Sequence, residues 1–237
     1  MKKNTTFLAA LLFAGGLSAQ VITDTVHTDA SYANDNYYTL NDGNQFTVDR
    51  SNWDLAFACD GMGGQATTIR INDGIGTELY LYSSDTSDWS TLDTTGFDWS
   101  QNALYNSDES WETGAFENMT LSGPFDVGWG DYNVTTHQIT GSRLFILKLS
   151  DGTYRKIVID ALINNDYTFR YAELSGANTT TGTVTQTNHS GKNFGYYSIL
   201  NYTDLDREPA TSSWDLVFTK YVTMIAPNTP YPVTGIL

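Results

Sequence analysis

The sequence predicts an all-β protein, with antiparallel strands arranged as a sandwich-like single domain and an extra strand pair at the C-terminal end. Two observations support this prediction. Apolar and polar residues alternate in short runs, as in Trp53, Leu55 and Phe57, and this period of two is typical of half-buried strands. Long stretches with the helical period are missing from the sequence, and Gly, Asn and Asp separate the runs, as turns require.

The clearest strands lie in the middle of the chain. Residues 143–174 contain three apolar-rich runs separated by turn residues, so we expect a three-stranded antiparallel meander there. Its first turn contains Asp151-Gly152, a dipeptide that supplies the positive φ angles of a tight hairpin. Residues 69–71 and 78–82 flank Asn72-Asp73-Gly74, and this arrangement predicts a further hairpin with a slightly longer turn.

Two segments break the strand pattern. Residues 85–133 are polar but contain tryptophans, so we expect a loop that folds back and packs on the core, with helical turns at 87–92 and 110–117. Residues 175–192 are mainly Thr, Asn and Gly, which predicts an exposed polar linker. The four tryptophans of the first segment are Trp89, Trp99, Trp111 and Trp129.

An internal repeat appears on the two sides of the predicted linker. Residues 37–57 and 196–218 both contain a Tyr-Tyr strand, an Asp-Arg pair and a Trp-Asp-Leu motif followed by Phe, in the same order. The tyrosine-to-tryptophan spacing is 15 residues in the first copy (38 to 53) and 17 in the second (197 to 214). We interpret this as a duplicated two-strand unit, and expect residues 193–237 to pack on the main domain because they are too few to form one.

The N-terminus has the layout of a secretory signal. Two lysines precede the apolar run at residues 7–14, and small residues lead to Ala19, so residues 1–19 are predicted to be a signal peptide cleaved near Ala19. Removing Lys2 and Lys3 changes the formal charge from −15 to −17 (10 minus 27). We therefore expect a secreted, extracellular or cell-surface protein without a membrane span.

Composition narrows the function class. The 27 acidic residues exceed the 12 basic ones, which argues against a nucleic-acid partner. The single cysteine, Cys59, follows an apolar run and is expected to be a buried free thiol. The sequence contains no nucleophile elbow, zinc-protease helix or phosphate-binding loop, so we expect a protein that is not an enzyme.

The order and spacing of several motifs resemble the HmuY-like family, whose members are exported, haem-binding, all-β proteins of Bacteroidetes-type bacteria. The resemblance covers roughly residues 36–174. The motifs that carry it are Trp-Asp-Leu-Ala-Phe at 53–57, Arg-Ile-Asn-Asp-Gly at 70–74, Leu-Lys-Leu-Ser-Asp-Gly-Thr-Tyr-Arg-Lys-Ile at 147–157 and Phe-Arg-Tyr-Ala at 169–172.

The resemblance implies a HmuY-like domain over residues 20–174 and haem as a small-molecule ligand. Family members hold haem through two axial side chains, usually histidines and sometimes methionines, and no local motif places these ligands here. His137 and His189 are the candidates for binding the cofactor and its metal, with His27 weaker because it lies near the mature N-terminus. The alternative that none of the three binds haem stays open.

Other ligands and roles also stay open at this stage. Calcium is a further candidate, with oxygen ligands from Asp204 and Asp206 or from Asp42 and Asn44. The tryptophans suggest a carbohydrate-binding module, in which indole rings stack on the sugars of a surface glycan. Exposed edge strands suggest a structural role, as an adhesin or fibre subunit that self-associates.

Overall fold

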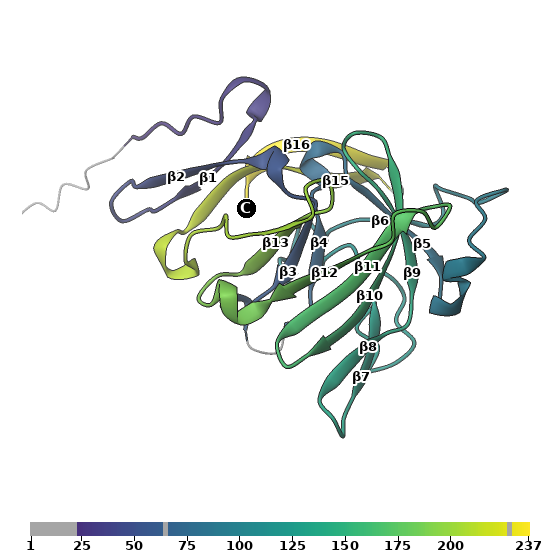
Figure 1. The fold of residues 1–237 in the computed structure, drawn as a ribbon. Helices are drawn as coiled ribbons and strands as arrows, with labels where there is room; N and C mark the ends of the chain where they lie inside the picture. Colours follow the sequence, from purple (N-terminus) through teal and green to yellow (C-terminus); the bar gives the residue numbers. More distant parts are fainter. Residues whose placement is uncertain (1–22, 64–65, 227–228) are drawn as a thin grey trace, which may run out of the picture.

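The computed structural model describes residues 23–63, 66–226 and 229–237, so the predicted signal peptide at 1–19 lies outside the described residues. The prediction of an all-β antiparallel fold is confirmed (Figure 1). None of the helices in the described part of the chain is long and apolar enough to cross a membrane. These helices are short 3-10 turns: η1 (Ala30–Tyr32), η2 (Arg50–Asn52), η3 (Asp60–Met62), η4 (Asp73–Ile75), η5 (Thr86–Ser90), η6 (Gln186–His189) and η7 (Thr211–Ser213).

The largest sheet contains the predicted meander. Leu149 N donates to Thr153 O at 2.9 Å, and Gly152 between them has a φ of 82°, so the tight turn forms where Asp-Gly predicts it. The meander over residues 143–174 is therefore confirmed. In order, this sheet runs β12 (Thr180–Thr185), β11 (Asp166–Glu173), β10 (Tyr154–Ile163), β9 (Leu144–Lys148), β5 (Glu78–Ser83) and β6 (Ala103–Leu104), while β8 (Gln138–Gly141) pairs with β10 and with β7 (Gly130–Asn133).

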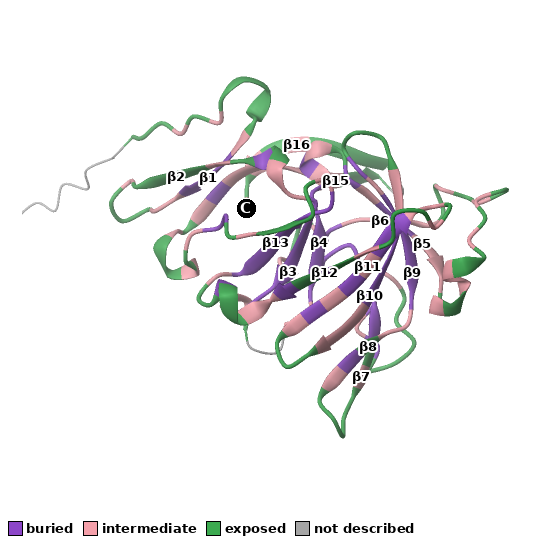
Figure 2. Cartoon of the chain, in the orientation of Figure 1, coloured by how far each residue is buried: buried purple, intermediate pink, exposed green. Residues whose placement is uncertain are grey.

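A second, four-stranded sheet packs on the large one and forms the main core with it. Phe57 of the second sheet stacks on Phe169 of the large sheet, with ring centroids 5.0 Å apart. Figure 2 shows the buried strands of both sheets in this region. The order in the second sheet is β14 (Thr203–Leu205), β13 (Phe194–Ser198), β3 (Leu55–Ala58) and β4 (Ile69–Ile71).

A third sheet lies toward the surface. β1 is buried at its centre, whereas β2, β15 and β16 are half-buried or exposed over most of their length, and Phe46 on β2 is 48% exposed (Figure 2). The order is β16 (Thr229–Ile236), β15 (Leu216–Ala226), β1 (Asn34–Tyr38) and β2 (Gln45–Asp49).

The two copies of the sequence repeat exchange strands. β1 of the first copy pairs with β15 of the second, with Tyr38 opposite Leu216. β13 of the second copy pairs with β3 of the first, with Tyr197 opposite Leu55. The register is the same in both pairs: the second tyrosine of one copy lies opposite the leucine of the Trp-Asp-Leu motif of the other copy. Each copy thus supplies strands to both the second and the third sheet, which ties residues 193–237 to the N-terminal strands.

The Trp-Asp motifs hold these crossed pairs by equivalent contacts. Asp54 accepts a hydrogen bond from Ile199 N at 2.7 Å, and Asp215 accepts one from Leu40 N at 2.7 Å. The indole rings are also equivalent, since Trp53 meets Tyr196 and Trp214 meets Tyr37, each pair nearly edge to face at about 5 Å. The repeat therefore encodes the pairing itself.

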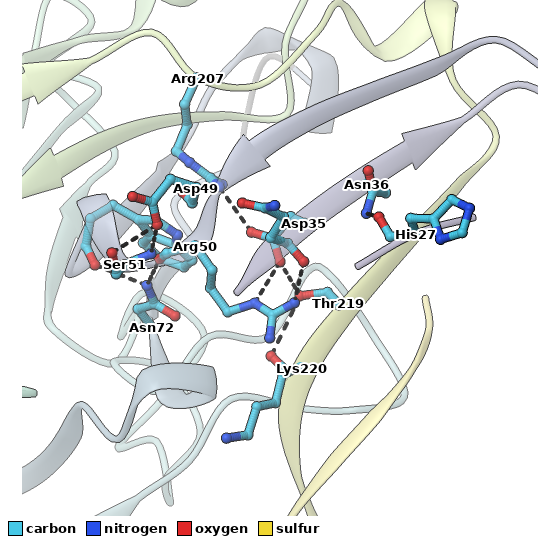
Figure 3. A network of polar contacts seen from close by, with 12 residues as sticks. His27, Asp35, Asn36, Asp49, Arg50, Ser51, Asn72, Arg207, Thr219 and Lys220 are labelled. Carbon is cyan, nitrogen blue, oxygen red and sulfur yellow. Dashed lines mark hydrogen bonds and ion pairs between the residues drawn. The ribbon is translucent and has the colours of Figure 1, made fainter. Parts of the chain in front are cut away.

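A buried charge cluster joins the two copies (Figure 3). Asp35 on β1 lies between Arg50 Nε at 2.8 Å and Arg207 Nη2 at 2.9 Å, and the Thr219 hydroxyl donates to the same carboxylate at 2.6 Å. The two arginines occupy equivalent positions in the Asp-Arg pairs of the repeat. Because all three charged side chains are buried, removing one would leave another without its partner.

Two predictions about connections are wrong. β4 and β5 do not form a hairpin over residues 69–82, because β4 pairs with β3 and β5 pairs with β9 in different sheets. Residues 175–192 are not an exposed linker, because they contain β12 and η6. Buried and exposed residues alternate along β12 despite its polar composition, and Gly182 and Val184 are the buried ones. A Cβ on Gly182 would lie 2.3 Å from the Phe169 ring, so only glycine fits there.

The tryptophan-rich loop packs on the core as predicted. Trp129 is fully buried and donates to Thr67 O at 2.9 Å. Trp99 packs against Tyr80, and Trp89 lies under the Lys156 ammonium at 4.7 Å. Of the two predicted helical turns, η5 forms near 87–92, whereas residues 110–117 form turns without a helix. A carbohydrate-binding module needs exposed indole rings that can stack on sugars, and these tryptophan rings already contact other side chains of the protein.

The free edge of β16 is a poor template for another strand. Val217 and Leu237 exchange both backbone hydrogen bonds. Along β16, the backbone N–H and C=O groups of every second residue, counted back from Leu237, therefore point toward β15, and those of the residues in between point away from the sheet. Pro230 and Pro232 occupy two of the outward positions and have no N–H to donate. Prolines on an edge strand oppose strand addition, so this edge gives no support to self-association.

Candidate functional site

His137 lies at the mouth of an open cavity of about 550 Å³. It is the last residue of the turn between β7 and β8, is exposed, and has a positive φ of 56°. Asn133 shapes this turn, because its side chain accepts from Thr135 N at 2.9 Å and its carbonyl accepts from His137 N at 2.8 Å. The turn presents the imidazole beyond the end of the hairpin.

A tyrosine orients the His137 ring. His137 Nδ1 lies 2.6 Å from the Tyr132 hydroxyl, across the same hairpin. When Nδ1 carries the proton and donates a hydrogen bond to this oxygen, the lone pair of Nε2 is free to bind a metal or to accept a hydrogen bond. The Tyr132 hydroxyl thus orients the imidazole ring, and the sequence alone did not reveal this contact.

The cavity is lined by apolar side chains and, over the larger part, by neutral polar groups. Val127, Ile139 and Leu162 line it, and Phe125 beside it is 52% exposed and stacks on Tyr132 at 6.4 Å. The polar lining consists of amides and hydroxyls: Thr67, Thr136, Gln138, Asn164, Asn165 and Gln186. Flat aromatic surface beside an oriented imidazole suits a planar, largely apolar ligand.

His189 is placed very differently. It is only 2% exposed, its Nε2 lies 2.9 Å from Asp204, and its Nδ1 lies 3.5 Å from Asp206. The hydrogen bond to Asp204 raises the pKa of His189 and outweighs the opposing effect of burial. A Cβ on Gly195 would lie 2.4 Å from this ring, so β13 makes room for it. His189 is thereby held as part of the packing between η6 and β14.

The structure does not bring the two predicted histidines to one cavity. His189 is not among the described residues that line the cavity of His137, and neither is any methionine. Met119 packs on the main core and Met62 on a smaller cluster behind β3, while Met224 is exposed on β15. His27 is exposed near the N-terminus, where its carbonyl accepts from Asn36 (Figure 3).

The predicted calcium ligands are occupied by protein partners. Asp204 contacts His189, Asp206 contacts Lys192, and Asp42 accepts two hydrogen bonds from Asn44. Within the described residues, no group of three or more His, Cys, Asp or Glu side chains is arranged to hold a metal ion. Cys59 is a buried free thiol, and burial raises its pKa to about 12.

The residues at the His137 cavity fit haem in part. They supply one axial imidazole with a hydrogen-bonded second nitrogen, an aromatic surface and enough volume for part of a porphyrin. They supply no second histidine or methionine among the described lining residues. A haem bound here would therefore be held by a single histidine, His137, among the described lining residues.

The fold and cavity define an all-β protein with an open, partly apolar cavity and a single oriented histidine. Comparison with protein families matches residues 31–176, well over half of the chain, to the family described as HmuY protein. The chain belongs to the HmuY family, as the sequence motifs indicated, and this family is associated with haem binding and export. No curated protein and no solved structure matches the chain.

Proposed function

We propose that this protein is an exported, non-enzymatic haem-binding protein in which His137 supplies the axial ligand. The observation that carries the proposal is the 2.6 Å contact between His137 Nδ1 and the Tyr132 hydroxyl. When Nδ1 donates to this hydroxyl, Nε2 is left free at a cavity lined by both polar and apolar groups. Family membership makes haem the ligand that fits this arrangement.

The surroundings of His137 support a partly exposed ligand. Phe125, Val134 and Leu121 are 52%, 55% and 44% exposed, which is unusual for large apolar side chains on one hairpin and its neighbouring loop. A volume of about 550 Å³ lies in the usual range for small-molecule sites. No Lys or Arg is among the described lining residues, so ligand carboxylates would face water or neutral donors such as Asn165.

Hemin titration of His137→Asn tests the proposal. Asparagine accepts a positive φ, so this substitution removes the imidazole without adding strain to the turn. We expect wild-type protein to give a shifted Soret band at one equivalent, and the variant to bind at least about tenfold more weakly because the iron–nitrogen bond is lost. His27→Ala is the matched control, since it removes an exposed histidine away from the cavity, and it should bind like wild type.

Two outcomes would overturn the assignment. An unshifted spectrum in the wild-type protein would exclude haem binding, and equal binding by the His137→Asn variant would exclude this ligand. His189→Asn separates the two histidines: it should lower the free energy of unfolding but leave the Soret band of the folded protein unchanged. A Soret band that disappears in this variant while the fold persists would instead assign ligation to His189.

Export is the second part of the proposal. The charge and hydropathy pattern of residues 1–19 supports cleavage near Ala19, so the exported protein should begin at Gln20. Intact mass measurement of the protein recovered from the culture medium or cell surface would test this start. Retention of the N-terminal segment on the exported protein would contradict it.

A further inference from the structure

A second cavity, of about 420 Å³, lies between η4, the strands β5 and β6, and the β15–β16 hairpin. It shares no described lining residue with the cavity of His137. The proposed haem function therefore makes no use of it.

The walls of this cavity are mostly apolar and aromatic. Tyr80 and Tyr105 contribute rings from β5 and the segment after β6, and Leu104 lies between them. Val222 and Pro232 close the opposite side, from the β15–β16 hairpin. Such walls favour a ligand with an apolar body, and the tyrosine rings also suit a cation.

Thr77 supplies an unsatisfied hydroxyl to the cavity. Thr77 is among the residues that line the cavity and is only 2% exposed, and its buried Oγ1 has no hydrogen-bond partner among the described residues. A buried polar atom without a partner costs about 1–3 kcal/mol, so such groups are normally satisfied by a ligand or water. The hydroxyl therefore indicates that the cavity receives a polar group.

Asp73 supplies a carboxylate to the same cavity. It accepts from Asn106 Nδ2 at 2.9 Å and forms no ion pair with any residue that the structure describes. Burial raises the pKa of Asp73 to about 6, opposed by the charge of Arg70, so the carboxylate is mainly ionised at neutral pH. A partly buried negative charge without an ion-pair partner attracts a cation.

The other charged groups are Glu78 and Lys220, which line the cavity, and Arg70, which lies outside its lining. Glu78 is neutralised by Lys148, whose Nζ lies 2.7 Å away, and it also accepts from the Tyr80 hydroxyl. Arg70 donates to four backbone carbonyls of the loop at residues 107–113. Lys220 lines the cavity as a second cationic group and would disfavour a ligand with a large positive charge.

We propose that this cavity binds a small organic amine, with its ammonium group at Asp73, its apolar body between the tyrosines and the proline wall, and Thr77 as an additional polar contact. The site is separate from the haem site, so each can be tested without the other. The occupant has one positive charge, because one carboxylate lacks an ion-pair partner and Lys220 opposes a second charge.

A set of three matched probes tests the proposal on the unaltered protein. Phenethylamine, its neutral analogue 2-phenylethanol and the anion 3-phenylpropionate share an apolar body and differ in the terminal group. Nitrogen-15 NMR titration at neutral pH should show saturable shifts near Thr77 and Tyr105 for the amine, with affinity at least about tenfold above that of the other two. Absence of saturable shifts with the amine, or equal affinity for the alcohol or the acid, would overturn the proposal.

Variants locate the charge. Asp73→Asn should weaken amine binding about tenfold or more and leave binding of the alcohol unchanged. Glu112→Gln removes the same charge from an exposed loop position and should leave amine binding unchanged. Equal amine affinity in wild type and folded Asp73→Asn would overturn the assignment. The probe comparison needs no variant, so the proposal stays testable if Asp73→Asn does not fold. Hemin titration of the same variants should match wild type.

Discussion

The two crossed strand pairs of the repeat have the same register and the same Trp-Asp contacts, but very different surroundings. The β3–β13 pair is buried along its whole length and packs on the large sheet. In the β1–β15 pair only the centre of β1 is buried, while β15 is mostly half-buried and becomes exposed toward its C-terminal end. Equal motifs therefore specify equal pairing, while the position of each pair in the molecule decides how much apolar surface it buries.

This difference separates local pairing from core formation. Pairing depends on backbone geometry and on contacts between neighbours, such as Trp53 with Tyr196 and Trp214 with Tyr37. Core formation depends on another sheet covering one face, and the large sheet covers only the β3–β13 pair. Substitutions at equivalent positions should therefore differ in cost.

The largest difference is expected at the equivalent phenylalanines. Phe57→Ala removes a fully buried ring that contacts Tyr167 and Phe169, and should lower the free energy of unfolding by about 3–5 kcal/mol. Phe218→Ala removes a half-buried ring and should cost about 1 kcal/mol. Equilibrium urea denaturation measures both. Equal losses would show that the two sheets contribute alike.

A smaller difference is expected at the equivalent aspartates. Asp54→Ala leaves the buried Ile199 amide without an acceptor and should cost about 2–3 kcal/mol. Asp215→Ala affects an exposed carboxylate that binds Leu40 N, and should change stability by less than about 0.5 kcal/mol. The same denaturation experiment compares them. A loss of similar size in both would mean that the motif contact, rather than its burial, carries the stability.

A third difference is a pH dependence expected from Glu208, which has no acidic counterpart in the first copy. The second copy has Glu208 after its Asp-Arg pair where the first has Ser51, and Glu208 accepts from Tyr196 at 2.6 Å and Asn193 N at 2.7 Å. Burial raises the pKa of Glu208 from 4.5 to about 7.

The folded protein consequently keeps this proton after the unfolded chain has lost it, so the contribution of Glu208 to stability falls as the pH rises from 4.5 to about 7. Glu208→Gln should flatten this part of the curve of unfolding free energy against pH, whereas Ser51→Ala should not change its slope. Denaturation at several pH values in this range measures it, and an unchanged slope in Glu208→Gln would refute the assignment.

Much of the fold could be predicted because its signals are local. Asp151-Gly152 and the apolar runs around it specified the meander, and the repeated Tyr and Trp-Asp motifs indicated the duplication. The hairpin at 69–82 was wrong because the partners of β4 and β5 lie far away in the sequence. The linker at 175–192 was wrong because β12 joins the large sheet, and the burial of Gly182 and Val184 on its inner face outweighs a polar composition.

The site was only partly predictable. His137 was one of two histidines named as candidates, but its orientation depends on Tyr132, which approaches it only when β7 and β8 pair. His189 and Asp204 were both noted from the sequence, yet as candidates for different ligands, and the fold places them 2.9 Å apart. The second cavity gave no sequence signal, because the residues around it come from strands that lie far apart in the chain.

The sequence alone determined the strand class, the meander, the duplication and the family, because alternation, turn residues and motif order depend on near neighbours along the chain. Only the tertiary structure decided which copy is buried, which histidine is exposed and where a carboxylate without an ion-pair partner lines a cavity. Those properties depend on which distant segments cover a given face, and therefore on solvent exclusion that no local pattern encodes.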